Sequence, residues 1–325
     1  MMARAIRIHD YGAPEVLTWE EVAVGDPGPG EVRLRQHAVG LNYIDTYHRT
    51  GLYKLASLPA VIGMEGAGTV QEVGAGVKGL KVGDRVAYAG VLGGYAEERL
   101  IAADRLVKLP SSIDDVTAAA MMLKGMTVRY LLRETYPCTA KTVLLFHAAA
   151  GGVGLIACQW TRAIGATMIG TVGSEEKALL AEVNGCTHVI NYRTEDYVAR
   201  VKKITGGKGC DVVYDSVGKD TFPSSLDCLK PKGLWVSVGN SSGPVPPFEL
   251  SILSAKGSLY ATRPALMTYI AARADLLANT SELFDMVGKG AVRIAVSRTY
   301  PLREAAAAHR DLEARRTTGS IVLVP

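Results

Sequence analysis

The chain has 325 residues, of which 48% are hydrophobic and 21% charged, and its net charge is +4. The length favours two domains, and the composition is that of a folded soluble protein rather than a disordered one. Because the net charge is small and no dense run of Lys and Arg occurs, the sequence does not indicate nucleic acid or a membrane as a partner.

The cysteine pattern and the first residues bear on the cellular compartment. The five cysteines are widely spaced and include no C-x-x-C pair, which argues against a zinc knot, a redox dithiol and a secreted disulfide framework. The opening MMARAIRIHDYG lacks the apolar stretch of a signal peptide, and no segment is apolar for long enough to span a bilayer. We therefore expect a reduced, cytoplasmic protein.

The first hundred residues favour short strands. Residues 31–36 and 69–73 alternate polar and apolar side chains, as half-buried strands do. Clusters of turn-forming residues, such as 25–30, separate these runs. We expect a mostly β domain in this part of the chain.

From residue 114 the pattern changes to helices that alternate with buried strands. A helix is expected at 114–133, followed by strands at 142–146, 166–172, 187–191, 210–215 and 234–238 and by helices at 152–164, 175–184 and 194–205. This alternation predicts βαβ units and a buried, doubly wound parallel sheet of the Rossmann class. Helices are then expected around 265–288 and 302–314. The apolar segment 320–324 is expected to pair within a sheet, for which the N-terminal domain is one candidate.

A glycine motif follows the first of these parallel strands. It reads Ala149-Ala150-Gly151-Gly152-Val153-Gly154 and leads directly into the predicted helix. The small residue at 149 permits a tight turn, Gly151 lets backbone approach a pyrophosphate, and Gly154 lets helix and strand pack closely. The helix N-terminus would offer free N–H groups to the phosphates. With a strand before it and a helix after it, the motif predicts a dinucleotide site.

The second parallel strand indicates which nicotinamide cofactor binds. In NAD-preferring folds an Asp or Glu at its end binds the ribose hydroxyls, whereas here the strand ends without an acid at Ser174. Glu175 and Glu176 follow at the start of a helix, where carboxylates favour the helix dipole. A 2′-phosphate would find the hydroxyl of Ser174, the ammonium of Lys177 and the phenol of Tyr192 nearby. The pattern therefore favours NADPH over NADH.

These motifs resemble the medium-chain dehydrogenase/reductase superfamily over essentially the whole chain. Within it, the chain is similar to the quinone oxidoreductases of the ζ-crystallin-like branch. The resemblance rests on Gly74 with the stretch 82–86, VGDRV, and on the motif at 149–154 followed by Gln159 and Arg162. It implies a mostly β, GroES-like catalytic domain formed by 1–124 and 265–325, and a Rossmann NADPH-binding domain at 125–264. It also implies a homodimer joined at sheet edges, for which residues 250–260 are a candidate edge.

The resemblance also implies site residues. The stretch 42–47, NYIDTY, matches a segment lining the family's active cleft, and the sequence KGMT at 124–127 matches a turn against the nicotinamide. The residues implied as catalytic are Asn42, Tyr47 and Tyr53. The residues implied to bind the cofactor are Asn42, Thr127, Ala149, Gly151, Gly152, Val153, Gly154, Ser174, Lys177, Tyr192, Gly239, Asn240, Ser241 and Arg315.

The stretch 63–68, GMEGAG, bears on metal binding. Zinc alcohol dehydrogenases of the superfamily carry G-H-E-x-x-G there, and in this chain Met64 replaces the zinc-binding His. A thioether is a poor ligand for Zn²⁺, and no Cys lies near Asn42. We therefore expect no zinc, although Glu65 and Asp45 remain a conceivable residual site. The stretch is expected to be a turn that Glu65 stabilises by hydrogen bonds. The six histidines form no metal or triad pattern: His37, His48 and His309 are expected to be isolated, and His147 to be packed or capped.

Without zinc, little would polarise an alcohol, whereas a quinone accepts hydride readily because its product is aromatic. The hypothesis is hydride transfer from NADPH to a quinone or similar small electrophile. Asn42, Tyr47 and Tyr53 would hydrogen-bond its oxygen, and a tyrosine or water would supply a proton; packing is the alternative role of the tyrosines. Two other functions stay open: an NADPH-dependent enone or 2-enoyl reductase, and a non-catalytic NADPH-binding or nucleic-acid-binding protein.

Overall fold

A computed structural model describes all 325 residues, which divide into two compact units. The first unit comprises Met1–Met126, Ile270–Gly288 and Ile294–Pro325, and the second comprises Thr127–Tyr269 and Lys289–Arg293. No helix in the chain has the length and apolar character needed to cross a membrane.

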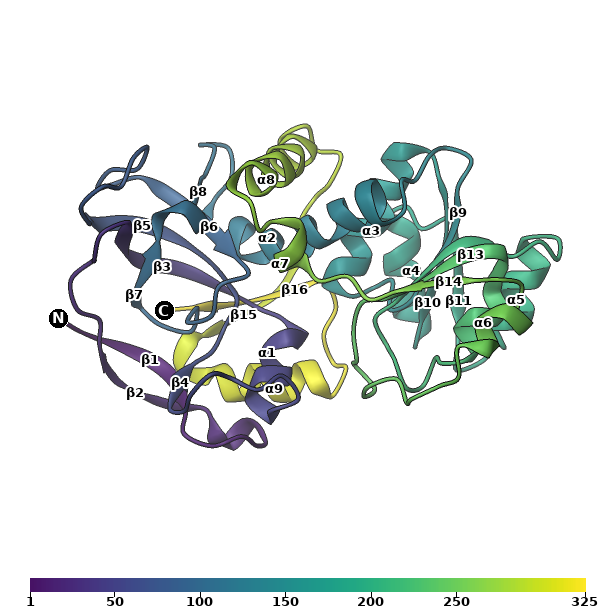
Figure 1. Cartoon of the computed structure of the whole chain (residues 1–325), viewed down its shortest axis with the longest axis horizontal. Helices are drawn as coiled ribbons and strands as arrows, with labels where there is room; N and C mark the ends of the chain where they lie inside the picture. The colour runs from purple at the N-terminus through teal and green to yellow at the C-terminus, as the bar shows by residue number, and fades with distance from the viewer. The chain divides into compact units, whose positions relative to one another are not determined.

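The first unit is built on two sheets (Figure 1). The larger sheet contains β3 (Glu31–Leu41), β5 (Glu65–Val73), β6 (Arg85–Ala89), β7 (Glu98–Ala102), β8 (Val107–Lys108), β15 (Val296–Pro301) and β16 (Ser320–Val324). The smaller sheet has the order β2 (Thr18–Ala23), β1 (Met2–Ile8), β4 (Ala60–Val61). The last strand pairs antiparallel with β3, with Ile321 opposite Leu41, which confirms that it pairs in a sheet of the N-terminal part.

Three helices of the first unit are α1 (Tyr43–Thr50), α8 (Arg273–Gly288) and α9 (Ala305–Glu313), and α2 (Asp115–Tyr130) begins in it. Apolar side chains of β1, β3, β16 and α9 meet in one buried core, to which Ile6, Leu41, Ile321 and Ala308 belong. Residues far apart in the sequence, from the first strand to the last, thus pack α9 against strands of both sheets.

The second unit is built on a parallel sheet, as the sequence predicts, and its strand order is β11-β10-β9-β12-β13-β14. Its strands are β9 (Val143–Phe146), β10 (Thr167–Val172), β11 (His188–Asn191), β12 (Cys210–Asp215), β13 (Leu229–Ser237) and β14 (Tyr260–Thr262). Its helices are α3 (Gly152–Ile164), α4 (Glu175–Val183), α5 (Tyr197–Ile204), α6 (Ser251–Ala255) and α7 (Leu266–Tyr269). The strands bury residues such as Leu145, Ile169 and Val213 on a common core.

The expectation that residues 63–68 form a turn is wrong, because Glu65–Val73 is one strand and only Gly63 and Met64 precede it. The glycines serve strand packing instead. A Cβ on Gly68 would lie 1.9 Å from the carbonyl oxygen of Arg35, and one on Gly66 would lie 2.5 Å from Gln36 Oε1. Glycine is therefore needed at position 68, where the backbone of β3 passes too close for any side chain.

Three further expectations are corrected. The segment 265–288 is two helices, because the Arg105 guanidinium binds the carbonyls of Ile270 and Ala271, which separates α7 from α8. Residues 250–260 are mostly α6 and a turn, so the sheet edge is β14 instead. The sequence KGMT at 124–127 is not a turn but lies within α2. Gly125 fits there because a Cβ would lie 2.5 Å from Leu283 Cδ1, on the helix that packs against it.

Candidate functional site

The glycine motif connects β9 to α3 in the second unit. Ala148 has a left-handed backbone (φ 56°), and the Ala149 N–H donates to the Thr171 carbonyl at 3.0 Å, which fixes the loop to β10. Gly151 is the N-cap of α3, so Gly152 and Val153 form its first turn. A Cβ on Gly154 would lie 2.4 Å from the Ala149 carbonyl oxygen, so the close approach of loop and helix requires glycine. The first N–H groups of α3 are thereby presented at the end of the sheet.

A buried polar network around His147 holds this loop in place. Ser225 Oγ donates to Asp215 Oδ2 at 2.8 Å, so its single proton is used and it must accept from His147 Nε2 at 3.0 Å. His147 Nδ1 therefore accepts from Thr171 Oγ1 at 2.9 Å. Burial lowers the pKa of His147, which keeps the imidazole neutral. His147 is thus a packed, hydrogen-bonded residue, as expected.

The end of β10 gathers the residues predicted to bind a 2′-phosphate. Ser174 is the N-cap of α4, and its Oγ accepts from the Lys177 N–H at 3.3 Å. Tyr192 follows β11 and is 42% exposed, with its hydroxyl 2.6 Å from the position of a Cβ on Gly173. Glu175 is engaged by Asn191 Nδ2 at 2.6 Å. A hydroxyl, a lysine and a phenol therefore lie at one strand end with the helix N-terminus.

The loop after β13 contains Gly239, Asn240 and Ser241. It is held against the end of β12, because a Cβ on Gly239 would lie 2.6 Å from the Ser216 carbonyl oxygen and the Ser241 N–H donates to that oxygen at 3.2 Å. The Arg263 guanidinium donates to Ser237 Oγ at 2.6 Å. Thr127 lies elsewhere in this unit, half-buried on α2.

In the first unit, Asn42 is the buried N-cap of α1. Its N–H donates to Asp45 Oδ2 at 2.9 Å, and its Nδ2 donates to Glu65 Oε2 at 2.7 Å. The fully buried Glu65 carboxylate also accepts from the Leu123 N–H at 2.7 Å and pairs with Lys124 Nζ at 3.3 Å. Glu65 therefore does stabilise by hydrogen bonds, as expected, but it joins a strand to two helices rather than closing a turn.

Tyr47 and Tyr53 lie together on and just after α1. Their ring centroids are 5.2 Å apart at an interplanar angle of 65°, and the Tyr53 N–H donates to the Tyr47 carbonyl at 3.0 Å. Gly51 permits this return of the chain because it takes the left-handed conformation at the C-cap (φ 76°). The structure thus brings Tyr47 and Tyr53 together, whereas Asn42 lies at the N-terminal end of the same helix.

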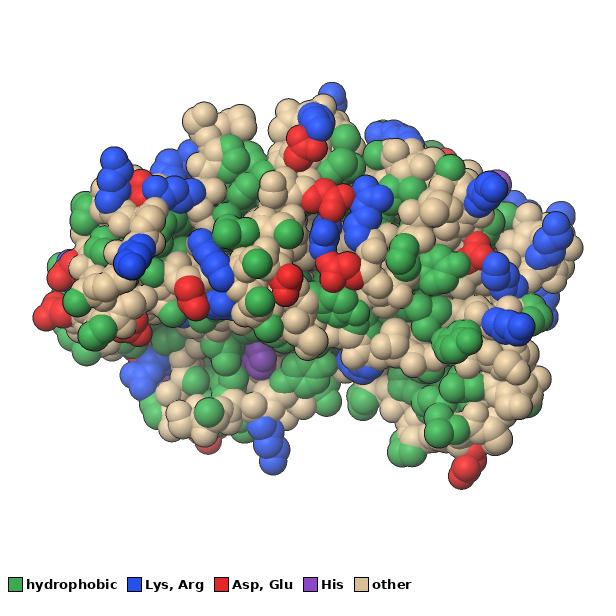
Figure 2. Space-filling view, turned by 45° about the horizontal axis from the view of Figure 1, so that its top comes forward, with side chains coloured by type: hydrophobic (Ala, Val, Ile, Leu, Met, Phe, Trp, Pro, Cys, Tyr) green, Lys and Arg blue, Asp and Glu red, His purple; other side chains and the backbone are tan.

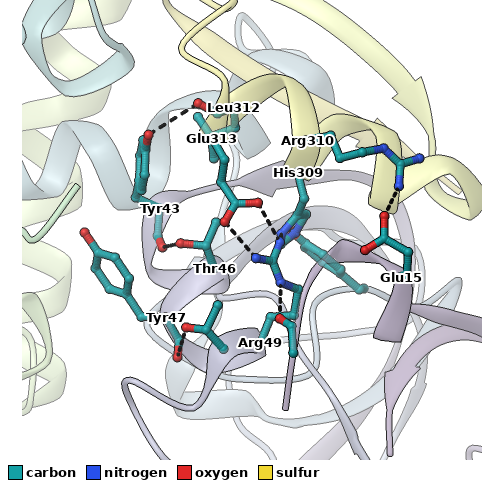
Figure 3. Close-up of polar contacts among 12 residues, drawn as sticks. Glu15, Tyr43, Thr46, Tyr47, Arg49, His309, Arg310, Leu312 and Glu313 are labelled. Atoms are coloured by element: carbon teal, nitrogen blue, oxygen red, sulfur yellow. Dashed lines mark hydrogen bonds and ion pairs between the residues drawn. The ribbon is translucent and has the colours of Figure 1, made fainter. Parts of the chain in front are cut away.

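A second network, centred on the buried Arg49 and His309, joins α1 to α9, and the sequence did not reveal it (Figure 3). Arg49 is paired with Glu313 and contacts His309, which in turn contacts Tyr95. The expectation that His309 is isolated is therefore wrong, as is that for His37, whose Nδ1 lies 2.8 Å from Asp115 Oδ2. Burial and the Arg49 charge lower the pKa of His309 to about 3, and burial raises the pKa of Asp45, which accepts from Tyr95, to about 7. Arg49 and Tyr95 lie more than two hundred residues from their partners on α9, so no local pattern signals these contacts.

Arg315 lies directly after α9 in a left-handed conformation (φ 58°). Its N–H donates to the Leu312 carbonyl at 3.0 Å, and the Arg316 N–H donates to the Asp311 carbonyl at 3.1 Å. These two bonds are the Schellman end of a helix, in which glycine usually occupies the left-handed position. A non-glycine residue held in this conformation is a reason to look for a function.

No group of three or more His, Cys, Asp or Glu side chains is arranged to hold a metal ion. Met64 is buried just before β5, at the position where the zinc enzymes of the superfamily carry a histidine. The prediction that the protein works without zinc rests on this residue chemistry.

Comparison with known proteins identifies the class. Residues 28–111 match the alcohol dehydrogenase GroES-like domain family, and residues 152–275 match the zinc-binding dehydrogenase family. A quinone oxidoreductase of Pseudomonas aeruginosa is 54% identical over the full length of both chains. A 2-haloacrylate reductase of a Burkholderia species is 49% identical over 100% of this chain and 99% of its own.

A solved structure agrees with these relatives. The crystal structure of Escherichia coli quinone oxidoreductase complexed with NADPH has a TM-score of 0.98 and 52% identity, and the match covers 99% of this chain and 100% of that one. The chain belongs to the medium-chain dehydrogenase/reductase superfamily and, within it, to the quinone oxidoreductases.

Proposed function

We propose that the protein is an NADPH-dependent reductase that transfers reducing equivalents to a quinone without a metal. The observation that carries the proposal is the end of β10, where Ser174, Lys177 and Tyr192 gather and no carboxylate occupies the strand tip. High identity to quinone oxidoreductases, one of them solved with NADPH, supports it.

The glycine loop would bind the pyrophosphate through the first N–H groups of α3, with His147 and Asp215 keeping the loop in place. Lys177 would pair with the 2′-phosphate, since a flexible ammonium at a helix N-terminus suits a dianion. We assign the remaining cofactor contacts to Asn42, Thr127, Ala149, Gly151, Gly152, Val153, Gly154, Gly239, Asn240, Ser241 and Arg315.

When bound, NADPH would supply a hydride to the acceptor. Asn42 and the pair Tyr47–Tyr53 would orient the quinone by hydrogen bonds to one oxygen, and a tyrosine hydroxyl or a water would deliver the proton that completes the quinol. Glu65 would assist by holding the Asn42 amide in a fixed direction at 2.7 Å. A quinone needs no metal to accept hydride, which suits a site with Met64 in place of a ligand.

A second candidate function is reduction of an activated C=C bond. The 2-haloacrylate reductase that is 49% identical favours it, because its name implies an α,β-unsaturated substrate. The same hydride and the same proton source would serve both reactions. Only the residues that shape the acceptor pocket would differ.

A nucleic-acid-binding role has less support. On the face shown in Figure 2, Lys and Arg side chains are scattered singly or in small groups among acidic ones. We further propose a cytoplasmic homodimer that uses the edge of β14, where Tyr260 is 62% exposed.

The test is a panel of acceptors with NADPH: 1,4-benzoquinone, 2-chloroacrylate, an enone and a 2-enoyl thioester. The proposal predicts the highest kcat/KM for the quinone, and a loss of turnover in the Tyr47→Phe, Tyr53→Phe double variant. A higher kcat/KM for 2-chloroacrylate would establish the second candidate. Unchanged turnover in the double variant would remove both hydroxyls from the mechanism.

A further inference from the structure

The turn after α9 is held from one side by α1. Tyr43, the first residue of α1, donates from its hydroxyl to the Leu312 carbonyl at 3.3 Å, and the same carbonyl accepts the Arg315 N–H at 3.0 Å. Burial raises the pKa of Tyr43, and the charge of the nearby Arg315 opposes this rise. Tyr43 thus binds the carbonyl that closes the left-handed turn.

A second connection reaches Glu313, two residues before Arg315. Arg49 donates from Nη1 and Nη2 to the two Glu313 carboxylate oxygens at 2.9 and 2.7 Å (Figure 3). This bidentate geometry restrains both position and orientation of the carboxylate, which a single contact would not do. Both connections come from one short helix, α1.

The Arg49 guanidinium is itself held in place, because it is only 1% exposed and its Nε donates to the Gly12 carbonyl at 3.0 Å. A guanidinium can only donate, so His309 Nδ1 accepts from Arg49 at 3.0 Å. His309 Nε2 then carries the proton and donates to Tyr95 Oη at 3.0 Å, and Tyr95 donates to Asp45 Oδ2 at 3.0 Å. This series of hydrogen bonds ends on Asp45, which lies on α1 like Arg49. Arg49 and His309 are therefore anchored at both ends to the same helix.

The geometry points to Tyr43 and Arg49 as positioning residues for Arg315. Together they hold the end of α9 in the strained conformation from which Arg315 contacts the cofactor, and they tie this turn to the helix that carries Asn42 and Tyr47. This inference rests on the proposed function, since it presumes that Arg315 contacts NADPH.

The chain offers a matched control on the same helix. Arg310 pairs with Glu15 at 2.8 Å, but both side chains are more than half exposed and neither contacts the turn. Removing this pair alters α9 without altering the restraint on Arg315. Arg310→Gln therefore separates a general effect on the helix from an effect on the turn.

The experiment measures the Kd of NADPH by fluorescence titration, together with kcat and KM for NADPH with 1,4-benzoquinone. We expect Tyr43→Phe and Glu313→Gln each to raise the Kd and the KM roughly 3- to 10-fold, the range of one or two lost hydrogen bonds, while kcat changes little. In an Arg315→Ala background the same substitutions should leave the Kd unchanged, because their target is gone. Arg310→Gln should bind NADPH like the wild type.

Three results would overturn the inference. One is an equal rise in Kd with and without Arg315, which would mean that the effect does not pass through this residue. Another is a loss of thermal stability in Tyr43→Phe and Glu313→Gln at unchanged Kd, which would assign them a purely structural role. The third is wild-type affinity in Arg315→Ala, which would refute the inference while leaving NADPH-dependent quinone reduction intact. Failure of the wild type to bind NADPH would instead refute the proposed function itself, and the inference with it.

Discussion

Replacing Arg315 by glycine should make the protein more stable and its cofactor binding weaker at the same time. A side chain in the left-handed region costs about 1 kcal/mol, and glycine at this helix-ending position removes that cost. The Schellman hydrogen bonds involve only backbone atoms, so they survive the substitution. Loss of a guanidinium contact to NADPH would cost about 1.5–3 kcal/mol, or roughly 10- to 100-fold in Kd.

Arg315→Gly should raise stability without NADPH but reduce the stabilisation that NADPH provides. Which of the two proteins is more stable should therefore depend on whether NADPH is present. Without NADPH, Arg315→Gly should gain about 1 kcal/mol in urea unfolding. With NADPH at about 100 times the wild-type Kd, the wild type gains about 2.7 kcal/mol and a variant that binds 30-fold more weakly gains about 0.9 kcal/mol. The wild type should then be the more stable protein.

Arg316→Gly is the matched control for this substitution. Arg316 is adjacent and exposed, and its backbone is not left-handed, so glycine there should lower stability slightly and leave the Kd unchanged. The reasoning fails if Arg315→Gly loses stability without NADPH as the control does. It also fails if both variants bind NADPH equally well.

Three further predictions address other parts of the chain. Lys177→Ala should raise the KM for NADPH about tenfold and leave that for NADH unchanged, because only NADPH carries the 2′-phosphate; an equal effect on both cofactors in steady-state assays would contradict this. The pKa of Asp45 is about 7 in the folded protein, whereas its ordinary value is 3.8. Asp45 therefore binds more protons in the folded than in the unfolded state, and its contribution to the free energy of unfolding falls as the pH rises from about 4 to about 7. The stability of the wild type relative to Asp45→Asn, measured by urea unfolding, should therefore be greater at pH 5 than at pH 8, and a difference independent of pH would refute the assignment. Gly68→Ala should prevent folding or destabilise by more than about 3 kcal/mol, since the new Cβ meets backbone at 1.9 Å, whereas Gly288→Ala, with nothing within 4 Å, should be tolerated; comparable solubility and melting temperatures would show that the strands can separate.

Much of the second unit could be predicted because its signals are local. The hydrophobic periodicity of buried strands and amphipathic helices can be recognised within a few residues. The predicted bounds of α3 and β12 match the structure. Helix α5 begins at Tyr197 rather than at residue 194, because Asp196 caps it by accepting from the Val198 and Ala199 N–H groups. The glycine motif could be recognised for the same reason, because its strand, turn and helix are contiguous in the sequence.

The rest depends on partners distant in sequence. Glycines at 63–68 predict a turn when read locally, but their use is the close approach of β3 to β5. Gly125 lies inside the helix expected at 114–133, and only the structure shows why glycine stands there, because a Cβ would meet Leu283. The network of Arg49, His309 and Glu313 had no sequence signal, because a histidine and two charged residues in amphipathic helices are typical of exposed faces. Only tertiary packing shows that Arg49 and His309 are buried together, with Glu313 paired to Arg49 at the surface.

The central claim is that this chain reduces quinones with NADPH and without a metal. The most direct test is the initial rate of nicotinamide oxidation with 1,4-benzoquinone in chelator-treated buffer, with NADPH and NADH compared as kcat/KM. We expect at least a tenfold preference for NADPH, in line with one lost ionic contact to the 2′-phosphate, and rates that neither the chelator nor added Zn²⁺ changes. Equal use of NADH, or activity that requires added Zn²⁺, would contradict it.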